Sequence, residues 1–209
     1  LDEFVNLYRP SERLQVILAL PVFFLPDLKD RCRDPANLSL AVQDVSPFPQ
    51  GGYTGSTPAA WLHGTVEYVL VGHRERRRYF HETVQDAANK VSEAIAEELC
   101  PILCCDKETV RRQLAAISGS DLDKSVLAYT PEDAAALEIA RKPSAVAAEI
   151  DRFSEMSGKR PVLYGGGVNA GNVGDLLTVD RVAGVMVAKG CLDPRQFIGL
   201  LENADRALG

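Results

Sequence analysis

The chain lacks any apolar run that approaches the roughly 18–20 residues needed to cross a bilayer. No signal peptide is visible at its start, and solenoid-type repeats and low-complexity segments are absent. We therefore expect a cytoplasmic protein with no membrane partner. Basic residues are fewer than acidic ones, 23 against 29, and the net charge of −6 argues against a nucleic-acid-binding surface.

Paired cysteine motifs are also missing. The five cysteines are an odd number, and none of them forms a CxxC pair. Free, buried thiols in a reducing compartment are the expected state. A metal site built from Cys100, Cys104 and Cys105 is disfavoured because no histidine lies near them in the sequence.

The remaining composition is that of an ordinary globular protein, with 46% hydrophobic and 25% charged residues. At 209 residues we expect one domain that covers 1–209. Short apolar runs alternate with amphipathic stretches, which predicts alternating strands and helices in a parallel α/β sheet or barrel. The runs are rich in Val, Ile and Leu without strict alternation, as in strands buried on both faces. The expected strands are Val16–Leu20, Leu38–Val42, Tyr68–Val71, Pro101–Cys104, Val126–Tyr129, Pro161–Tyr164 and Gly184–Val187.

Two helices have clear signals. The stretch Glu82–Glu98 carries its apolar residues on one stripe. Before the last helix, Asp193 is a good N-cap and Pro194 suits the first helical position.

Glycines follow two strands near the end of the chain. Tyr164-Gly-Gly-Gly-Val168 follows one strand, and Ala188-Lys189-Gly190 follows the next. Glycines let backbone N–H groups approach an anion closely. In (β/α)₈ barrels the phosphate commonly sits at the loops after strands seven and eight. The motif alone, without agreement from upstream residues, would favour two ordinary βα turns.

A second motif decides between these interpretations. Tyr68-Val-Leu-Val-Gly-His-Arg-Glu-Arg-Arg77 reads as a buried strand that ends in ionisable groups. This stretch resembles the triosephosphate isomerase family, whose pattern here is a strand followed by Gly-His-Ser-Glu-Arg-Arg. Further motifs match in the family's order, over nearly the whole chain: Gln43-Asp44-Val45, Gly51-Gly52-Tyr53-Thr54-Gly55, Pro101–Cys104, Val126–Tyr129, Tyr164-Gly-Gly166 and Leu192-Asp193-Pro194.

The resemblance implies a TIM (β/α)₈ barrel, of which the first strand and its Asn-x-Lys motif are absent. The chain opens with Leu1–Tyr8, which resembles the end of the first helix. Two further places are short against the family, after Lys107 and around Thr130. We therefore hypothesise that the sequence omits residues of the native protein. A native truncated barrel is the alternative, but it would expose two long sheet edges.

By resemblance, the protein is a cofactor-free sugar-phosphate isomerase that transfers a proton through an enediolate. His73 would be the electrophile, and Glu75 would order the site and pair with the catalytic lysine. Arg74 departs from the family's serine; it could lower the pKa of His73 or restrict the substrate. The phosphate would be bound by Gly165, Gly166, Gly167, Ala188 and Lys189. The loop at Gly51–Gly55 resembles the one that inserts into a neighbouring subunit, which implies a homodimer.

The catalytic base is the main departure from the family. The family carries Ala-Tyr-Glu-Pro where this chain has Ala128-Tyr129-Thr130-Pro131. Either Thr130 replaces the glutamate, or the segment that holds it is missing between Tyr129 and Thr130. In the second case, which we slightly favour, Thr130 caps the next helix and Glu132 and Asp133 lie in its first turn. Glu132 as a relocated base has no positional support.

The phosphate loops also depart from the family. Gly167 stands where the family has a serine, and Ala188-Lys189 stands for two glycines. These changes leave the substrate open between triose phosphates and a related tetrose phosphate. The alternative function is a catalytically inactive barrel that binds a phosphorylated ligand or a protein partner. A third interpretation, an unrelated phosphate-binding barrel, is weak against the colinear motifs.

Overall fold

The computed structural model describes residues 1–28, 36–131 and 142–209. Its centre is a sheet of seven parallel strands in the order β1-β2-β3-β4-β5-β6-β7. Each strand pairs with the next strand along the chain, as expected for repeated right-handed strand–helix–strand units. The strands are β1 Val16–Leu20, β2 Leu38–Val42, β3 Tyr68–Val71, β4 Cys100–Cys105, β5 Val126–Tyr129, β6 Val162–Tyr164 and β7 Val182–Val185.

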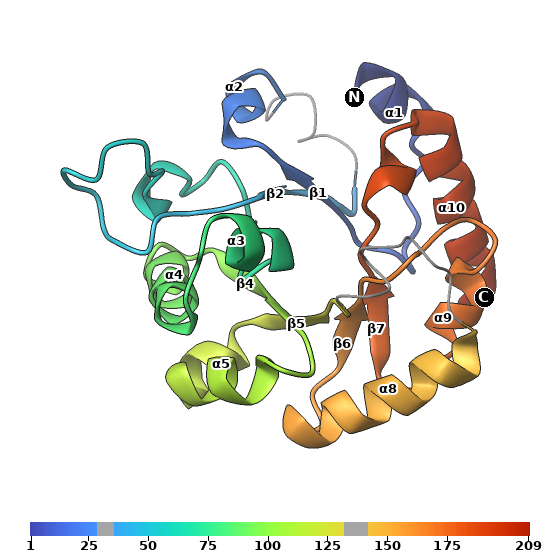
Figure 1. The fold of residues 1–209 in the computed structure, drawn as a ribbon. Helices are drawn as coiled ribbons and strands as arrows, with labels where there is room; N and C mark the ends of the chain where they lie inside the picture. Colours follow the sequence, from blue (N-terminus) through green and yellow to red (C-terminus); the bar gives the residue numbers. More distant parts are fainter. Residues whose placement is uncertain (29–35, 132–141) are drawn as a thin grey trace.

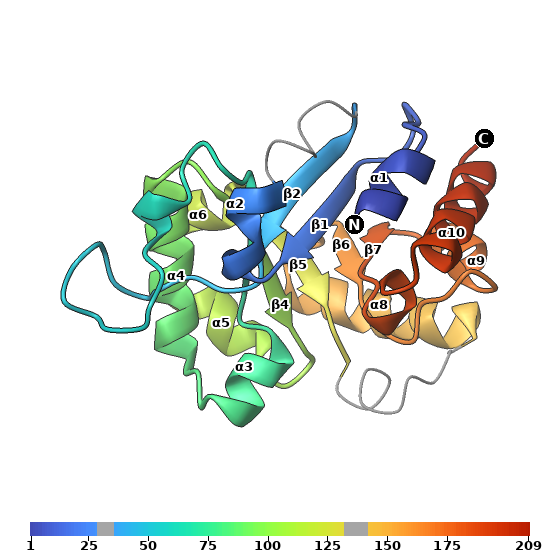
Figure 2. The ribbon, with the colours of Figure 1, turned by 90° about the horizontal axis from the view of Figure 1, so that it is seen from above.

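Helices cover the outer face of the sheet, which curls as in a (β/α)₈ barrel (Figure 1). Figure 2 shows the same arrangement from above. The described α-helices are α1 Asp2–Leu7, α2 Leu25–Leu28, α3 Arg74–Tyr79, α4 Val84–Ala96, α5 Val110–Ala116, α6 Gly119–Asp123, α8 Pro143–Met156, α9 Val173–Leu177 and α10 Pro194–Ala207. Short 3₁₀ turns lie at Val22–Phe24, Ala59–Trp61 and Lys189–Cys191. In the described part, no helix is long and apolar enough to cross a membrane.

The apolar core has two layers. The larger layer lies between the sheet and the helices, where Val91 of α4, Ile150 of α8 and Leu200 of α10 are almost fully buried. A smaller cluster lies inside the curl of the sheet and contains Ile102, Cys104 and Ala128. Both faces of the central strands are therefore buried, which explains their unbroken runs of Val, Ile and Leu.

The sheet is open between β1 and β7, which are the two ends of the strand order. An eight-stranded barrel has one more strand between them. The described residues contain no strand at this place, in agreement with the sequence-based expectation that the first strand of the barrel is absent. Helix α1 packs beside α10, where the rings of Phe4 and Phe197 stack at 5.3 Å.

The sequence-based element boundaries are confirmed within one residue for six of the seven strands. The last strand begins at Val182, two residues before the predicted Gly184, and ends at Val185. The register shows why. Val162 pairs with Val182 but Leu163 pairs with Gly184, so Ala183 forms a bulge that lets the strand start earlier. Asp193 caps α10 by accepting from the Gln196 N–H, with Pro194 at the first turn, as predicted.

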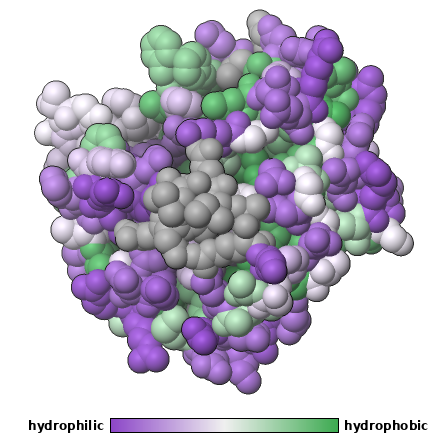
Figure 3. Space-filling view, turned by 45° about the vertical axis from the view of Figure 1, so that its right-hand side comes forward, coloured by the Kyte–Doolittle hydropathy of each residue, from purple (hydrophilic) through white to green (hydrophobic). Residues whose placement is uncertain are grey.

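Most of the face in Figure 3 is hydrophilic, with hydrophobic residues in separate patches between polar ones. The large apolar side chains that are exposed include Phe23, Trp61 and Leu192. Isolated exposed apolar residues are normal on a protein surface. Comparing a substitution at an exposed aromatic residue with one at a buried aromatic residue tests the packing of the core.

We predict that Phe153→Ala lowers the free energy of unfolding by about 3–5 kcal/mol, because it leaves a cavity between α8 and the sheet. Phe153 is 1% exposed, and its ring packs 4.9 Å from that of Tyr129. Phe23→Ala is the matched control, since Phe23 is 81% exposed. Its expected effect is within about 0.5 kcal/mol. Urea unfolding of both variants measures the difference, and equal losses would contradict this packing.

Candidate active site

The loop after β3 is shaped by Gly72. Its φ is +68°, a conformation that favours glycine. A Cβ on Gly72 would lie 2.7 Å from Gln113 Nε2 and 3.2 Å from the carbonyl oxygen of Cys104. Both the backbone conformation and the lack of space therefore require glycine here. This turn places His73 at the N-cap of α3, at the carboxyl end of the strand.

His73 is held in one protonation form. Its Nδ1 accepts a long hydrogen bond of 3.4 Å from the Glu75 N–H, so the ring proton belongs on Nε2. Burial lowers the pKa of His73 below its ordinary value, and the guanidinium groups of Arg74 and Arg77 lower it further. The carboxylates of Glu75 and Glu82 oppose this shift. The result is a neutral imidazole that can donate from Nε2.

Glu75 lies on the exposed side of this turn. Its Oε2 is 3.8 Å from His73 Nδ1, and its side chain is 59% exposed. The N–H of Glu75 thus contacts the histidine, while its carboxylate remains largely in solvent. The structure brings together the two residues that the sequence singled out on this loop.

A network of buried ion pairs holds the turn between β3 and α3 in place. Glu82 accepts from the Gly72 N–H at 3.1 Å and from Lys90 Nζ at 2.5 Å. Lys90 also contacts Asp44 at 2.5 Å, and Arg76 contacts both Asp44 and Glu82. The side chains of Lys90 and Glu82 are each 3% exposed. A buried charge is tolerated only when it is paired in this way.

Sequence reasoning missed Lys90 as part of this site. The available signal was its position in α4, between Ala88 and Val91 on the apolar stripe. A lysine on a buried helical face needs a carboxylate partner. The partner Asp44 follows β2, so only the tertiary structure brings the two together.

The two predicted phosphate loops lie next to each other, because β6 and β7 are neighbours. A Cβ on Gly190 would be 3.7 Å from the carbonyl oxygen of Val168. Gly167 has a φ of +57°, and its carbonyl accepts from the side chains of Asn169 and Asn172. Gly165 donates its N–H to the Tyr129 carbonyl at 2.9 Å, so this N–H continues the sheet.

Ala188 and Lys189, which follow β7, are exposed. Ala188 and Lys189 lie at the start of the 3₁₀ turn Lys189–Cys191, and the Ala188 carbonyl accepts from the N–H and thiol of Cys191. Gly165, Gly166, Gly167, Ala188 and Lys189 are therefore brought together at the carboxyl end of the sheet. His73 lies at the same end, after β3.

The described cysteines are free, as expected. Cys104 and Cys105 are buried, and burial raises the pKa of both thiols, that of Cys104 to about 12. Cys100 is half-buried, Cys191 is exposed, and Cys32 lies outside the described residues. In the described ranges, no three His, Cys, Asp or Glu side chains gather as metal ligands would.

Comparison with known proteins gives a consistent match. The family model of triosephosphate isomerase matches residues 1–204. The triosephosphate isomerase of Paracidovorax citrulli is 34% identical over 215 residues, which cover 92% of this chain and 85% of that protein. The enzyme of Delftia acidovorans is 33% identical and that of Synechococcus sp. 30%, each over 90% of this chain and over 85% and 80% of the respective relatives.

The chain belongs to the triosephosphate isomerase family. This membership makes it an isomerase of the intramolecular oxidoreductase class. It confirms the resemblance found in the sequence, and the seven parallel strands agree with the fold of that family.

Thr130 follows Ala128-Tyr129, after which the family pattern continues with its catalytic glutamate. Either Thr130 replaces that glutamate, or the segment that holds it is missing. Thr130 directly follows β5 and is 3% exposed. Its N–H and its Oγ1 both donate to the Cys105 carbonyl, at 2.9 and 3.4 Å. The sequence predicts that Thr130 caps a helix whose first turn contains Glu132. Residues 132–141 lie outside the described part. The N-cap of α8 is Lys142.

We predict that the stability of the fold depends on pH through His73. The folded protein binds the imidazole proton less tightly than the unfolded chain, because burial lowers the pKa of His73. As pH falls below about 6.5, the unfolded chain takes up this proton first and the folded state loses stability. His73→Gln removes this loss. The unfolding free energy of the variant, minus that of the native protein, should therefore rise as pH falls.

Urea unfolding at a series of pH values measures this difference. His63→Gln serves as the matched control for the loss of an imidazole, since His63 contacts the Glu97 carbonyl on another loop. Parallel curves for the native protein and His73→Gln would contradict a lowered pKa.

Proposed function

We propose that this protein interconverts the aldose and ketose forms of a small sugar phosphate, glyceraldehyde 3-phosphate and dihydroxyacetone phosphate or a related tetrose phosphate. The observation that carries the proposal is the state of His73. It is a half-buried imidazole whose pKa is lowered by burial, at the carboxyl end of a strand in a chain of this family. The reaction needs a group of this kind to polarise the substrate carbonyl.

A neutral imidazole suits this role better than an imidazolium. It donates one hydrogen bond from Nε2 to the oxygen that becomes negative in the enediolate. Its own proton stays available for transfer between the two substrate oxygens. The Glu75 N–H at Nδ1 favours the required tautomer.

The phosphate group would bind at the loops after β6 and β7. Gly165 uses its N–H within the sheet, so the N–H groups of Gly166 and Gly167 are the better candidates in that loop. Ala188 supplies a further N–H, and Lys189 adds a positive charge. The serine that the family has at position 167 is lost, which removes one hydroxyl from this site.

A base must also take a proton from the substrate carbon. Thr130 is unsuited to this step, because a neutral hydroxyl that donates to a backbone carbonyl does not accept a proton near pH 7. Glu82 is committed to Gly72, Arg76 and Lys90. Glu75 lies at the Nδ1 side of His73, away from the Nε2 that would face the substrate, so it suits the supporting role that the resemblance gives it. We therefore propose that the base is the glutamate of a segment that is missing between Tyr129 and Thr130.

The decisive experiment is a coupled isomerase assay with triose and tetrose phosphates. We expect turnover by the native protein and a loss of at least about 100-fold in kcat for His73→Gln, since general acid catalysis contributes about 10²–10⁴-fold. Glu75→Gln should lower kcat by a smaller factor, because Glu75 orders the site and does not take the proton. Glu108→Gln removes an exposed carboxylate from another loop and is the matched control.

A folded protein without turnover on either substrate would overturn the isomerase proposal. Calorimetric titration with dihydroxyacetone phosphate then tests the alternative, a barrel that binds a phosphorylated ligand. An unchanged kcat in Glu75→Gln would reject the supporting role of Glu75 and leave His73 in its role.

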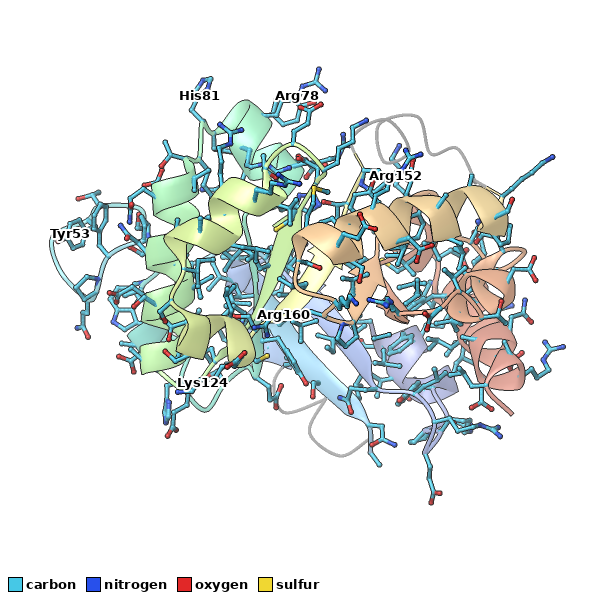
Figure 4. All side chains as sticks on the ribbon, turned by 90° about the horizontal axis from the view of Figure 1, so that it is seen from below. Tyr53, Arg78, His81, Lys124, Arg152 and Arg160 are labelled. Atoms are coloured by element: carbon cyan, nitrogen blue, oxygen red, sulfur yellow. The ribbon has the colours of Figure 1, made fainter. Side chains whose placement is uncertain are left out.

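We also propose that the protein forms a homodimer through the loop between β2 and β3. Phe48 and Tyr53 stack on this loop with ring centroids 4.6 Å apart, yet each is more than 40% exposed. Tyr53 points away from the barrel at the edge of Figure 4. A preformed, exposed aromatic pair costs little side-chain entropy on binding and buries a large apolar area.

Sedimentation velocity tests the dimer. The native protein should sediment as a dimer, and the double variant Phe48→Ser, Tyr53→Ser as a folded monomer, because polar side chains remove the apolar contact. Leu192→Ser, at an exposed apolar residue after β7, is the control that should remain dimeric. A native protein that is monomeric at every concentration would contradict the proposal.

The free thiols of Cys104 and Cys105 favour a cytoplasmic location.

A further inference from the structure

Asp106 directly follows β4 and is buried, with an exposed fraction of 5%. Its Oδ1 accepts from the N–H groups of Glu108 and Thr109, at 2.8 and 2.7 Å, and from the Thr109 hydroxyl. Its Oδ2 accepts from Arg77 Nη2 at 2.5 Å. The two oxygens of one carboxylate thus join the loop after β4 to a side chain of α3.

Arg77 carries this connection on to the turn that holds His73. Its Nη1 donates to the carbonyl oxygens of Gly72 and Cys104. The Gly72 carbonyl belongs to the peptide bond that leads into His73. The same glycine is held on its other side, where its N–H donates to Glu82. The turn before His73 is therefore fixed through both of its backbone polar groups.

We propose that Asp106 is a positioning residue for His73 and acts through Arg77 and the Gly72 carbonyl. The side chain of Arg77 is 14% exposed, so its guanidinium needs a counter-charge to stay where it is. Asp106 supplies that negative charge from the residue position that directly follows β4. Without it, Arg77 turns toward solvent, the Gly72 peptide loses a donor, and the imidazole loses its single orientation.

The catalytic consequence of this proposal rests on the proposed isomerase function, whereas the orientation of His73 does not. The test therefore has two readouts. Nitrogen-15 NMR of the histidine rings reports the tautomer of His73, and the chain has three histidines, so His73→Gln assigns the signals. The isomerase assay reports kcat and KM separately.

The main variant is Asp106→Asn. It keeps an oxygen for the N–H groups of Glu108 and Thr109 and removes the charge that faces Arg77. Asp106→Glu keeps the charge and should lie closer to the native protein. The matched control is Asp205→Asn, because Asp205 of α10 pairs with Arg13 and Ser11 away from the His73 turn.

In the native protein and in Asp205→Asn we expect one tautomer of His73, with its proton on Nε2. Asp106→Asn should show a mixture of both tautomers and a kcat lowered about 10–100-fold, with KM near the native value. A native tautomer and a native kcat in Asp106→Asn would overturn the proposal, even if stability falls, because Asp106 would then only fold its own loop.

Two further outcomes remain decisive. If the native protein shows no isomerase activity, the proposed function fails, and the tautomer alone decides the role of Asp106. If Asp106→Asn does not fold, Arg77→Lys takes its place. A lysine keeps the charge near Asp106, but its single ammonium group does not span the distance to the Gly72 carbonyl as well. The same tautomer mixture is expected, and a single native tautomer would contradict the proposal.

Discussion

The site depends on the carboxylate of Glu82. This one buried group accepts from the Gly72 N–H, from Lys90 and from Arg76. Asp44, after β2, completes the network with both cations. A buried ion network of this kind is costly when one member is missing and stable when every member is paired. It joins β2, the turn after β3, α3 and α4, and so fixes the position from which His73 faces the carboxyl end of the sheet.

The parallel sheet supplies the second constraint. Because all seven strands run in one direction, the loops that follow them meet at one end. Figure 4 makes this polarity visible: Arg78 and His81, which follow β3, lie at the top of the view, whereas Lys124, which precedes β5, lies at its lower left. His73 and both phosphate loops therefore share one end although more than 90 residues separate them in the sequence.

This family member keeps the histidine that we propose as the electrophile and alters the residues around it. Burial and two arginines lower the pKa of His73. Thr130 follows β5 either in place of the family's glutamate or after a missing segment that holds it. Gly167 and Lys189 change the phosphate loops in opposite senses, by removing a hydroxyl and adding a charge. The departures gather where the substrate would bind, and the strands that carry them remain those of the family.

The sequence by itself determined the order of strands and helices, the cap at Asp193 and the importance of Gly72-His73, because local periodicity, turn chemistry and a family motif are all written in neighbouring residues. It could not determine the partners of Lys90 or Asp106, since Asp44 and Arg77 lie 46 and 29 positions away. It also placed the start of the last strand two residues late, because the bulge at Ala183 follows from pairing with β6. Only the tertiary structure decided these points, since a buried charge is satisfied by whichever opposite charge the fold brings to it.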